Sequence, residues 1–330
     1  MNDFFEGDDF GVIAMTEAIN TLDVVPSRIG AMNLFQGGGI SSTVVGIESQ
    51  NNELRLIPTA KRGTMPEYKT ETKRSLRAIA VPHLPKNDTV DAESVQNLRA
   101  FGDESQLDSV ASVVNARLAL LKQEHELTWE YHRIGALQGK IKDADGTSTV
   151  VDLHTEFGVA RLEVNWDQTS ATGLKAACIE LRRLIESALN LLPYTAIQVE
   201  CSEGFWDDLM TSAETQAAFN RQQDNSFARE SNSAAFSYSQ ITFNELRGKV
   251  GSIPLIPDDE AFAFPITKAG LYKQFFAPAP FMETVNTVGK PYYAKQEPLR
   301  FGMGTEIHTN SNPLFLVTRP RVLVKLTKSA

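Results

Sequence analysis

The chain has 330 residues, of which 42% are hydrophobic and 22% are charged, the proportions of an ordinary soluble globular protein. Its formal net charge of −9 argues against a dedicated nucleic-acid reader, which needs a basic face, and the chain lacks a run of about 18 apolar residues that could cross a membrane. The two cysteines, Cys178 and Cys201, exclude a disulfide scaffold and a four-cysteine zinc site, and we expect a reducing cytoplasm as the place of synthesis.

The first 52 residues are acidic, with seven Asp and Glu side chains against one base, Arg28. They show no sustained helical period. They contain the run Gly37-Gly38-Gly39. Ordering three glycines costs more backbone entropy than ordering other residues, so such a run is typical of a mobile or tightly turning segment. No lysine follows in the spacing of a phosphate-binding loop. Residues 1–50 are therefore expected to form an extended N-terminal arm.

Residues 53–86 reverse this balance, with eight bases against three acids. Alternating apolar runs at 43–57 and 70–82 flank a polar tip and predict a long β-hairpin. Such a hairpin could clamp an acidic surface of a neighbouring copy, and a solvated surface loop is the alternative. The candidate interface residues are Arg55, Lys61, Arg62, Lys69, Lys73, Arg74 and Arg77.

Residues 103–139 carry the strongest helical pattern, with apolar side chains at spacings of three and four and Asp103 as the N-cap. A helix of this length would span roughly 50 Å and act as a strut. His125 and His132 share one face and are expected on its surface. After the helix, Asp145-Gly146 predicts a hairpin turn rather than a calcium loop, because the glutamate that ends such a loop is missing.

The second half of the chain alternates helices and strands. An amphipathic helix is predicted from Thr169 to Pro193, then a buried strand at 196–201 and a helix capped by Ser202. This order indicates an α+β layered domain. Residues 212–240 are expected to form a polar loop or lid. Strand-like runs follow at 241–256 and 261–266, and two more β runs flank Pro320.

The sequence shows no recognisable catalytic constellation. It contains neither HExxH nor GxSxG, and Cys178 lies on the apolar stripe of its helix, where a core role is expected. We predict no catalytic, cofactor-binding or metal-binding residue and no cofactor. The aromatic residues that cluster late in the chain are expected to anchor the core or an interface; they are Phe275, Phe276, Tyr292 and Tyr293.

Two segments resemble the major capsid proteins of tailed phages, specifically the lambda-type E family with the Hong-Kong-97-type shell fold. The more specific one is APAPFMETVNTVGKPYYAKQEPLRFGMGTEIHTNSNPLFLVTRPRVLVKL, from Ala277 to Leu326. The other is HELTWEYHRIGALQGKIKDADG, at the end of the long helix. The residues that match the family's C-terminal pattern are Pro278, Asn286, Gly289, Pro291, Tyr292, Tyr293, Asn312, Pro313, Leu314, Arg319, Pro320, Val322, Val324 and Leu326.

The resemblance implies an α+β Hong-Kong-97-type capsid fold and a division of the chain into named parts. Those parts are the N-terminal arm (1–50), an extended loop formed by the basic β-hairpin (51–88), a peripheral domain (89–165) with the spine helix 103–139, an axial domain (166–299), and C-terminal strands that return to the peripheral domain (300–330).

The function implied by the resemblance is a major capsid protein that assembles through pentamers and hexamers into an icosahedral head around double-stranded DNA. Its implied partners are further copies of itself, a separate scaffolding protein and a portal, and the binding of a decoration protein stays open. DNA would be touched only weakly and non-specifically, and no membrane is involved. The implied location is the virion, and the host cytoplasm before assembly. An encapsulin-like compartment shell and a cytoplasmic oligomeric enzyme remain as alternatives.

Overall fold

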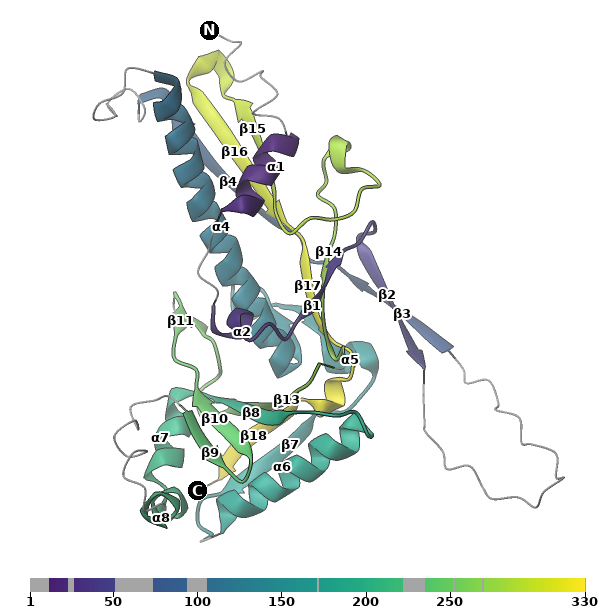
Figure 1. Ribbon diagram of the computed structural model, residues 1–330, viewed down its shortest axis with the longest axis vertical. Coiled ribbons are helices and arrows are strands. Elements are labelled where there is room, and N and C mark those ends of the chain that lie inside the picture. The colour runs from purple at the N-terminus through teal and green to yellow at the C-terminus, as the bar shows by residue number, and fades with distance from the viewer. Residues whose placement is uncertain are drawn as a thin grey trace, which may run out of the picture.

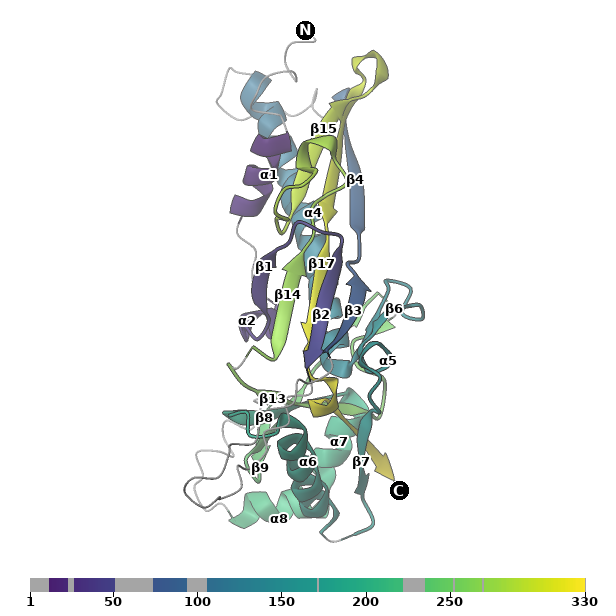
Figure 2. The same ribbon diagram turned by 90° about the vertical axis from the view of Figure 1, so that its right-hand side faces the viewer.

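The computed structural model describes residues 12–22, 27–50, 74–93, 106–170, 172–221, 235–251, 253–268 and 270–329. Figures 1 and 2 show an elongated molecule in which one long helix runs beside narrow sheets and ends at a broader layer of sheet and helices. Within these ranges, no helix has the length and hydrophobicity needed to cross a bilayer.

The long helix, α4 (Gln106–Gln138), confirms the predicted strut and has 33 residues. The predicted N-cap, Asp103, lies outside the described residues. One face of α4 packs against an antiparallel sheet in the order β15 (Tyr293–Pro298), β16 (Gly304–Ser311) and β4 (Leu84–Asp91). Because Val114, Leu118 and Leu121 are all buried, the apolar stripe read from the sequence is the face that meets the body.

The N-terminal arm differs from the extended segment that was expected. It contains two helices, α1 (Val12–Thr21) and α2 (Arg28–Ala31), which contact β15 and α4. Met15 and Ile19 lie one helical turn apart in α1 and both are buried. The ten-residue helix is short, and apolar residues also lie on its exposed side, where Ile13 is 72% exposed, so the sequence shows no one-sided period.

The glycine run forms a strand, and close packing rather than mobility explains two of its glycines. Strand β1 (Gln36–Gly39) pairs in parallel with β14 (Tyr272–Phe276), which also pairs antiparallel with β17 (Pro313–Val317). A Cβ atom on Gly37 would lie 1.9 Å from the carbonyl oxygen of Gln274, and one on Gly39 would lie 1.9 Å from that of Gly289. Only glycine allows the backbones to approach this closely.

The broad layer is a six-stranded mixed sheet with helices on it. Its order is β7 (Leu162–Asp167), β18 (Val324–Ser329), β13 (Ala261–Ile266), β8 (Ala196–Cys201), β10 (Ile241–Glu245) and β9 (Ala235–Tyr238). Helix α6 (Gly173–Leu189) packs along it and α7 (Glu203–Thr211) contacts β10 (Figure 1). The Ser202 hydroxyl accepts a bond from the Phe205 N–H, which confirms the predicted cap.

Strand β18 corrects the expected path of the C-terminus. It pairs in parallel with β7 and antiparallel with β13, so it belongs to the six-stranded sheet and not to the sheet beside α4. The prediction that all strands after residue 300 return to the peripheral domain is therefore wrong for β18. The predicted boundary at 165 also falls inside β7.

The remaining elements are short. Residues 212–240 are not wholly a loop, because they include α8 (Ala213–Arg221) and β9. Helix α6 ends at Leu189, where Asn190 adopts the left-handed conformation, four residues before the predicted stop at Pro193. The other elements are β2 (Val44–Gln50), β3 (Arg74–Ala80), β5 (Lys140–Lys142), β6 (Thr149–Asp152), α5 (Leu153–Phe157), β11 (Lys249–Val250), β12 (Ile253–Pro254), η3 (Met282–Thr284), η4 (Arg300–Gly302) and η5 (Pro320–Val322).

Candidate subunit interface

The predicted basic hairpin is present in its described part, where β2 and β3 pair antiparallel from Val44–Ala80 to Gln50–Arg74. Figure 1 shows the pair leaving the body at an angle. Val45 and Ile79 face each other across the two strands, and both are buried at 7% and 4% exposure. Their burial anchors the hairpin at its base.

Of the seven candidate bases, Arg55, Lys61, Arg62, Lys69 and Lys73 lie outside the described residues. Arg74 is the first residue of β3. Arg77 is half-buried. Its guanidinium lies against Gly158, the residue that ends α5: a Cβ atom added to Gly158 would lie 3.1 Å from the Arg77 Nη2. The structure therefore brings one predicted base against the body of its own chain.

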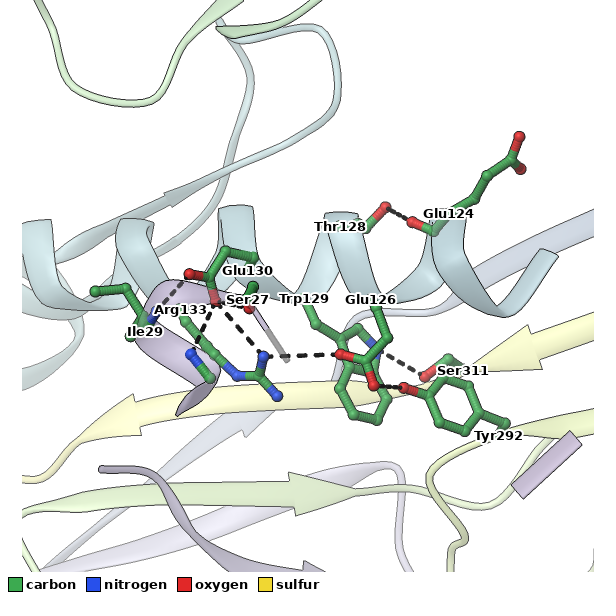
Figure 3. A network of polar contacts seen from close by, with 11 residues as sticks. Ser27, Ile29, Glu124, Glu126, Thr128, Trp129, Glu130, Arg133, Tyr292 and Ser311 are labelled. Atoms are coloured by element: carbon green, nitrogen blue, oxygen red, sulfur yellow. Dashed lines mark hydrogen bonds and ion pairs between the residues drawn. The ribbon is translucent and has the colours of Figure 1, made fainter. Parts of the chain in front are cut away.

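A buried carboxylate joins the arm to the long helix, and no sequence pattern predicted this contact. Glu130 of α4 accepts bonds from the Ser27 hydroxyl at 2.5 Å, the Ile29 N–H at 2.6 Å and the Gly30 N–H at 3.2 Å. Arg133 lies 3.6 Å from the same carboxylate (Figure 3). Since the partners are about 100 residues apart, no local pattern could have connected them.

An aromatic and polar group lies beside Glu130, formed by the preceding residue Trp129 and by Glu126 one helical turn earlier. Trp129 stacks on Tyr292 with ring centroids 4.6 Å apart and planes tilted by 7°. The Trp129 Nε1–H donates to the Ser311 hydroxyl at 3.0 Å, and the Tyr292 hydroxyl donates to Glu126 at 2.5 Å (Figure 3). The expected anchoring role is thus seen for Tyr292 in the core, and Phe276 and Tyr293 are buried as well.

A second arm contact reaches the six-stranded sheet. Arg28 of α2 lies 3.3 Å from the Glu200 carboxylate on β8 and donates at 2.8 Å to the carbonyl of Glu245 on β10. Burial raises the pKa of Glu200 to about 7, although the Arg28 charge opposes that shift. Helix α2 therefore connects the long helix and the sheet through two buried carboxylates.

The helix histidines are core residues and not surface residues, contrary to expectation. His125 and His132 are 4% and 2% exposed, and burial lowers the pKa of each to about 4. His125 bonds through Nε2 to the Thr309 hydroxyl at 3.0 Å. A helix covered on several sides buries polar positions that a one-sided pattern assigns to solvent.

The contacts described above are hydrogen bonds, ion pairs and ring stacking that join the arm, the long helix and the sheets. Among the described residues, no group of three or more His, Cys, Asp or Glu side chains could hold a metal ion. Cys178 is 2% exposed and burial raises its thiol pKa to about 12, so its predicted core role is confirmed.

Comparison with known proteins gives a consistent result over nearly the whole chain. The family model "Phage major capsid protein E" matches residues 11–328. The major capsid protein of Pseudomonas phage KPP10 is 25% identical over 338 residues, covering 94% of this chain and 95% of the relative.

Solved structures show the same fold at low sequence identity. A putative capsid protein of an Escherichia coli CFT073 prophage is 13% identical with a TM-score of 0.55, and 94% of this chain and 97% of that one are covered. The mature capsid of bacteriophage PhiM1 gives 11% identity and a TM-score of 0.53, with 93% and 90% covered. The expected α+β Hong-Kong-97-type fold is confirmed. With a family model that spans residues 11–328, the chain belongs to the phage major capsid protein E family.

Proposed function

We propose that this protein is the repeating unit of an icosahedral phage head, which it builds through pentamers and hexamers around double-stranded DNA. The observation that carries the proposal is the family match over residues 11–328, which leaves no large part of the chain for another task. Each subunit would offer heterologous contacts that close into rings, and many weak contacts per subunit would sum to a stable shell. This function requires no catalytic step.

Each part of the fold then has a proposed role. The arm (1–50) would brace its own subunit through α1 and α2, and the hairpin (51–88) would reach over an adjacent subunit. The six-stranded sheet with α6 and α7, to which we now assign β7 and β18, would meet its copies around the five- and six-fold axes. The sheet β15-β16-β4 with α4 would form the peripheral part of each subunit.

The basic hairpin is the proposed long-range contact. Its bases would bind an acidic surface of the next copy, because the chain has a net charge of −9 and complementary charge favours the correct partner and register. The base of the hairpin is held by Val45 and Ile79, so a change in the charges farther out should not disturb the fold of the subunit.

The experiment reverses four of these bases at once, Lys61, Arg62, Lys73 and Arg74, each to Glu. We expect an unchanged circular dichroism spectrum and no closed particles by electron microscopy. The control reverses four exposed bases elsewhere and changes the net charge equally; these are Lys175, Lys249, Lys268 and Arg321. Closed particles from the hairpin variant would contradict the clamp.

Further partners belong to the same proposal. A separate scaffolding protein, a portal and a decoration protein would act with this chain, which would fold in the host cytoplasm before it enters the virion. Contacts with packaged DNA would be weak and sensitive to salt, because an acidic subunit has few sites for phosphate. Particles that contain an enzyme cargo instead of DNA would favour the compartment-shell alternative. A small oligomer by size-exclusion chromatography that converts a metabolite would favour the enzyme alternative.

A further inference from the structure

A cavity of about 480 Å³ lies where α4 ends and α5 begins, and Gly158 in its lining lies beside Arg77 of β3. Its lining includes Gln138, Lys140, Asp152, His154, Thr155 and Arg161. We call this cavity the basic cleft. Neither the spine contacts nor the hairpin clamp described above uses it.

Two left-handed glycines shape the basic cleft. Gly139, with φ of 80°, ends the turn after α4, and a Cβ there would lie 2.5 Å from the His154 ring. Gly158, with φ of 61°, ends α5 beside the Arg77 guanidinium. Glycine at both positions lets the backbone turn sharply while two basic side chains lie against it. Arg77 also connects the cleft in space to the basic hairpin.

Among the described residues, three bases line or border the basic cleft, Lys140, Arg161 and Arg77, against one lining carboxylate, Asp152. In the part of the chain that the structure describes, Lys140, Arg161 and Arg77 form no ion pair. The Asp152 carboxylate lines the cleft, but its Oδ1 already accepts the N–H groups of His154 and Thr155 at 3.0 and 3.1 Å.

Two more acids act on Arg161 from nearby, Glu163 and Glu260. Glu260 is paired with Lys325 at 2.5 Å, so its charge is already compensated. Arg161 itself donates through Nη2 to the carbonyl of Gln138 at 2.8 Å, and its guanidinium lies 5.2 Å from the Phe262 ring. These contacts fix the position of the guanidinium while they leave its charge without a paired carboxylate.

The His154 ring adds an unsatisfied polar atom to the basic cleft. Its Nε2 is buried and has no hydrogen-bond partner among the described residues. A buried polar atom without a partner costs about 1–3 kcal/mol, which a bound ligand oxygen could recover. Burial and the Arg161 charge lower the pKa of His154, so the neutral ring can carry its proton on Nε2 and donate it.

We propose that the basic cleft receives a carboxylate side chain from a second copy of this chain, with Lys140, Arg161 and His154 as its ligands. The inference rests on the proposed function, because the shell supplies the second copy. It extends the hairpin clamp, since Arg77 of β3 borders both surfaces. A carboxylate fits the three donors, and the acidic composition of the chain supplies many.

The test couples Lys140 to carboxylates with a zero-length carbodiimide reagent, in assembled particles and in free subunits, and identifies the products by mass spectrometry. We expect a Lys140 amide to an Asp or Glu of another copy in particles and none in free subunits. Lys175, exposed on α6, serves as the lysine control. Lys140→Arg keeps the charge and should assemble normally without forming the product.

A second measurement removes the charges by the paired change Lys140→Gln and Arg161→Gln. The subunit concentration needed for assembly should rise about tenfold, which corresponds to about 1.4 kcal/mol. Wild-type particles in which Lys140 forms no amide, together with normal assembly of the paired variant, would overturn the inference.

Labelling of Lys140 by an amine-reactive acetylating reagent in empty particles but not in DNA-filled ones, with no amide product in either, would mean that a phosphate occupies the cleft and would also overturn it. Failure of the wild type to form any particle would instead contradict the proposed function itself, so the two failures are distinguishable.

Discussion

Replacing Glu130 with Ala should release helix α2 from the long helix. The side chain is only 9% exposed, and its carboxylate accepts three hydrogen bonds from Ser27, Ile29 and Gly30. Bonds to a charged acceptor contribute about 1.5–3 kcal/mol each, but they are not additive when they share one group. Removal of one partner from a buried charge pair costs about 3–5 kcal/mol. We expect the lower end of this range, about 3 kcal/mol, because Arg133 keeps its ion pair with Glu126 at 3.8 Å. Alanine itself favours the helix, so α4 should persist.

Native-state hydrogen exchange at the amides of Ile29 and Gly30 measures this release directly. A loss of about 3 kcal/mol should speed their exchange by more than a hundredfold, with a smaller change in the centre of α4. Glu124→Ala is the matched control: it lies on the same helix and pairs only with exposed Lys86, so about 0–1 kcal/mol is expected. In Figure 3 Glu124 points away from the cluster. Equal effects of the two variants would refute the reasoning.

Two further predictions concern the same region. Trp129→Phe loses the bond to Ser311 and part of the indole volume but keeps a ring that can stack on Tyr292, so it should cost less in urea denaturation than Trp129→Ala. Trp129→Ala also loses the stack and should cost about 3–5 kcal/mol, and equal costs would contradict this. Burial raises the pKa of Glu200 to about 7 from 4.5, so the folded state binds this proton more tightly than the unfolded chain. The contribution of Glu200 to the free energy of unfolding should therefore be fully present below about pH 4.5. It should fall by about 3 kcal/mol as the pH rises from there through 7. Glu200→Gln should flatten that slope in denaturation curves between pH 5 and 8, and an unchanged slope would exclude Glu200 as its source.

Local signals in the sequence were sufficient for many elements. The apolar spacing predicted α4, the Asp145-Gly146 turn predicted the β5–β6 hairpin, and the Ser202 cap predicted α7. Asp145 Oδ1 accepts the N–H groups of Thr147 and Ser148, each at 2.8 Å, which is the physical basis of that turn signal. Each of these features depends on residues a few positions apart.

Long-range contacts account for what the sequence could not predict. Lys122 has a polar position on the predicted helix, yet it is 5% exposed and its ammonium donates to the carbonyls of Leu22 at 2.6 Å and Asn20 at 3.3 Å. The arm supplies these carbonyls, so the face looked solvated only because the arm was taken as extended. The same reason explains Glu130 and part of the burial of the long helix.

The sequence also could not predict that the residues of the basic cleft lie close together. Lys140 lies in β5, His154 in α5 and Arg161 just before β7, and no ligand-binding motif in the sequence contains them. The family resemblance, by contrast, was readable from the sequence because its motif residues lie within one segment near the C-terminus, from Ala277 to Leu326. It was confirmed by the match over residues 11–328.

The proposed role as the repeating unit of a phage head is tested most directly by electron cryo-microscopy. The chain would be expressed together with the other head-assembly proteins and then purified. The account predicts closed shells in which copies form five- and six-membered rings, with α4 lying in the shell wall and the hairpin crossing onto the next copy. Dispersed monomers or small closed oligomers at high concentration, with all helper proteins present, would contradict it.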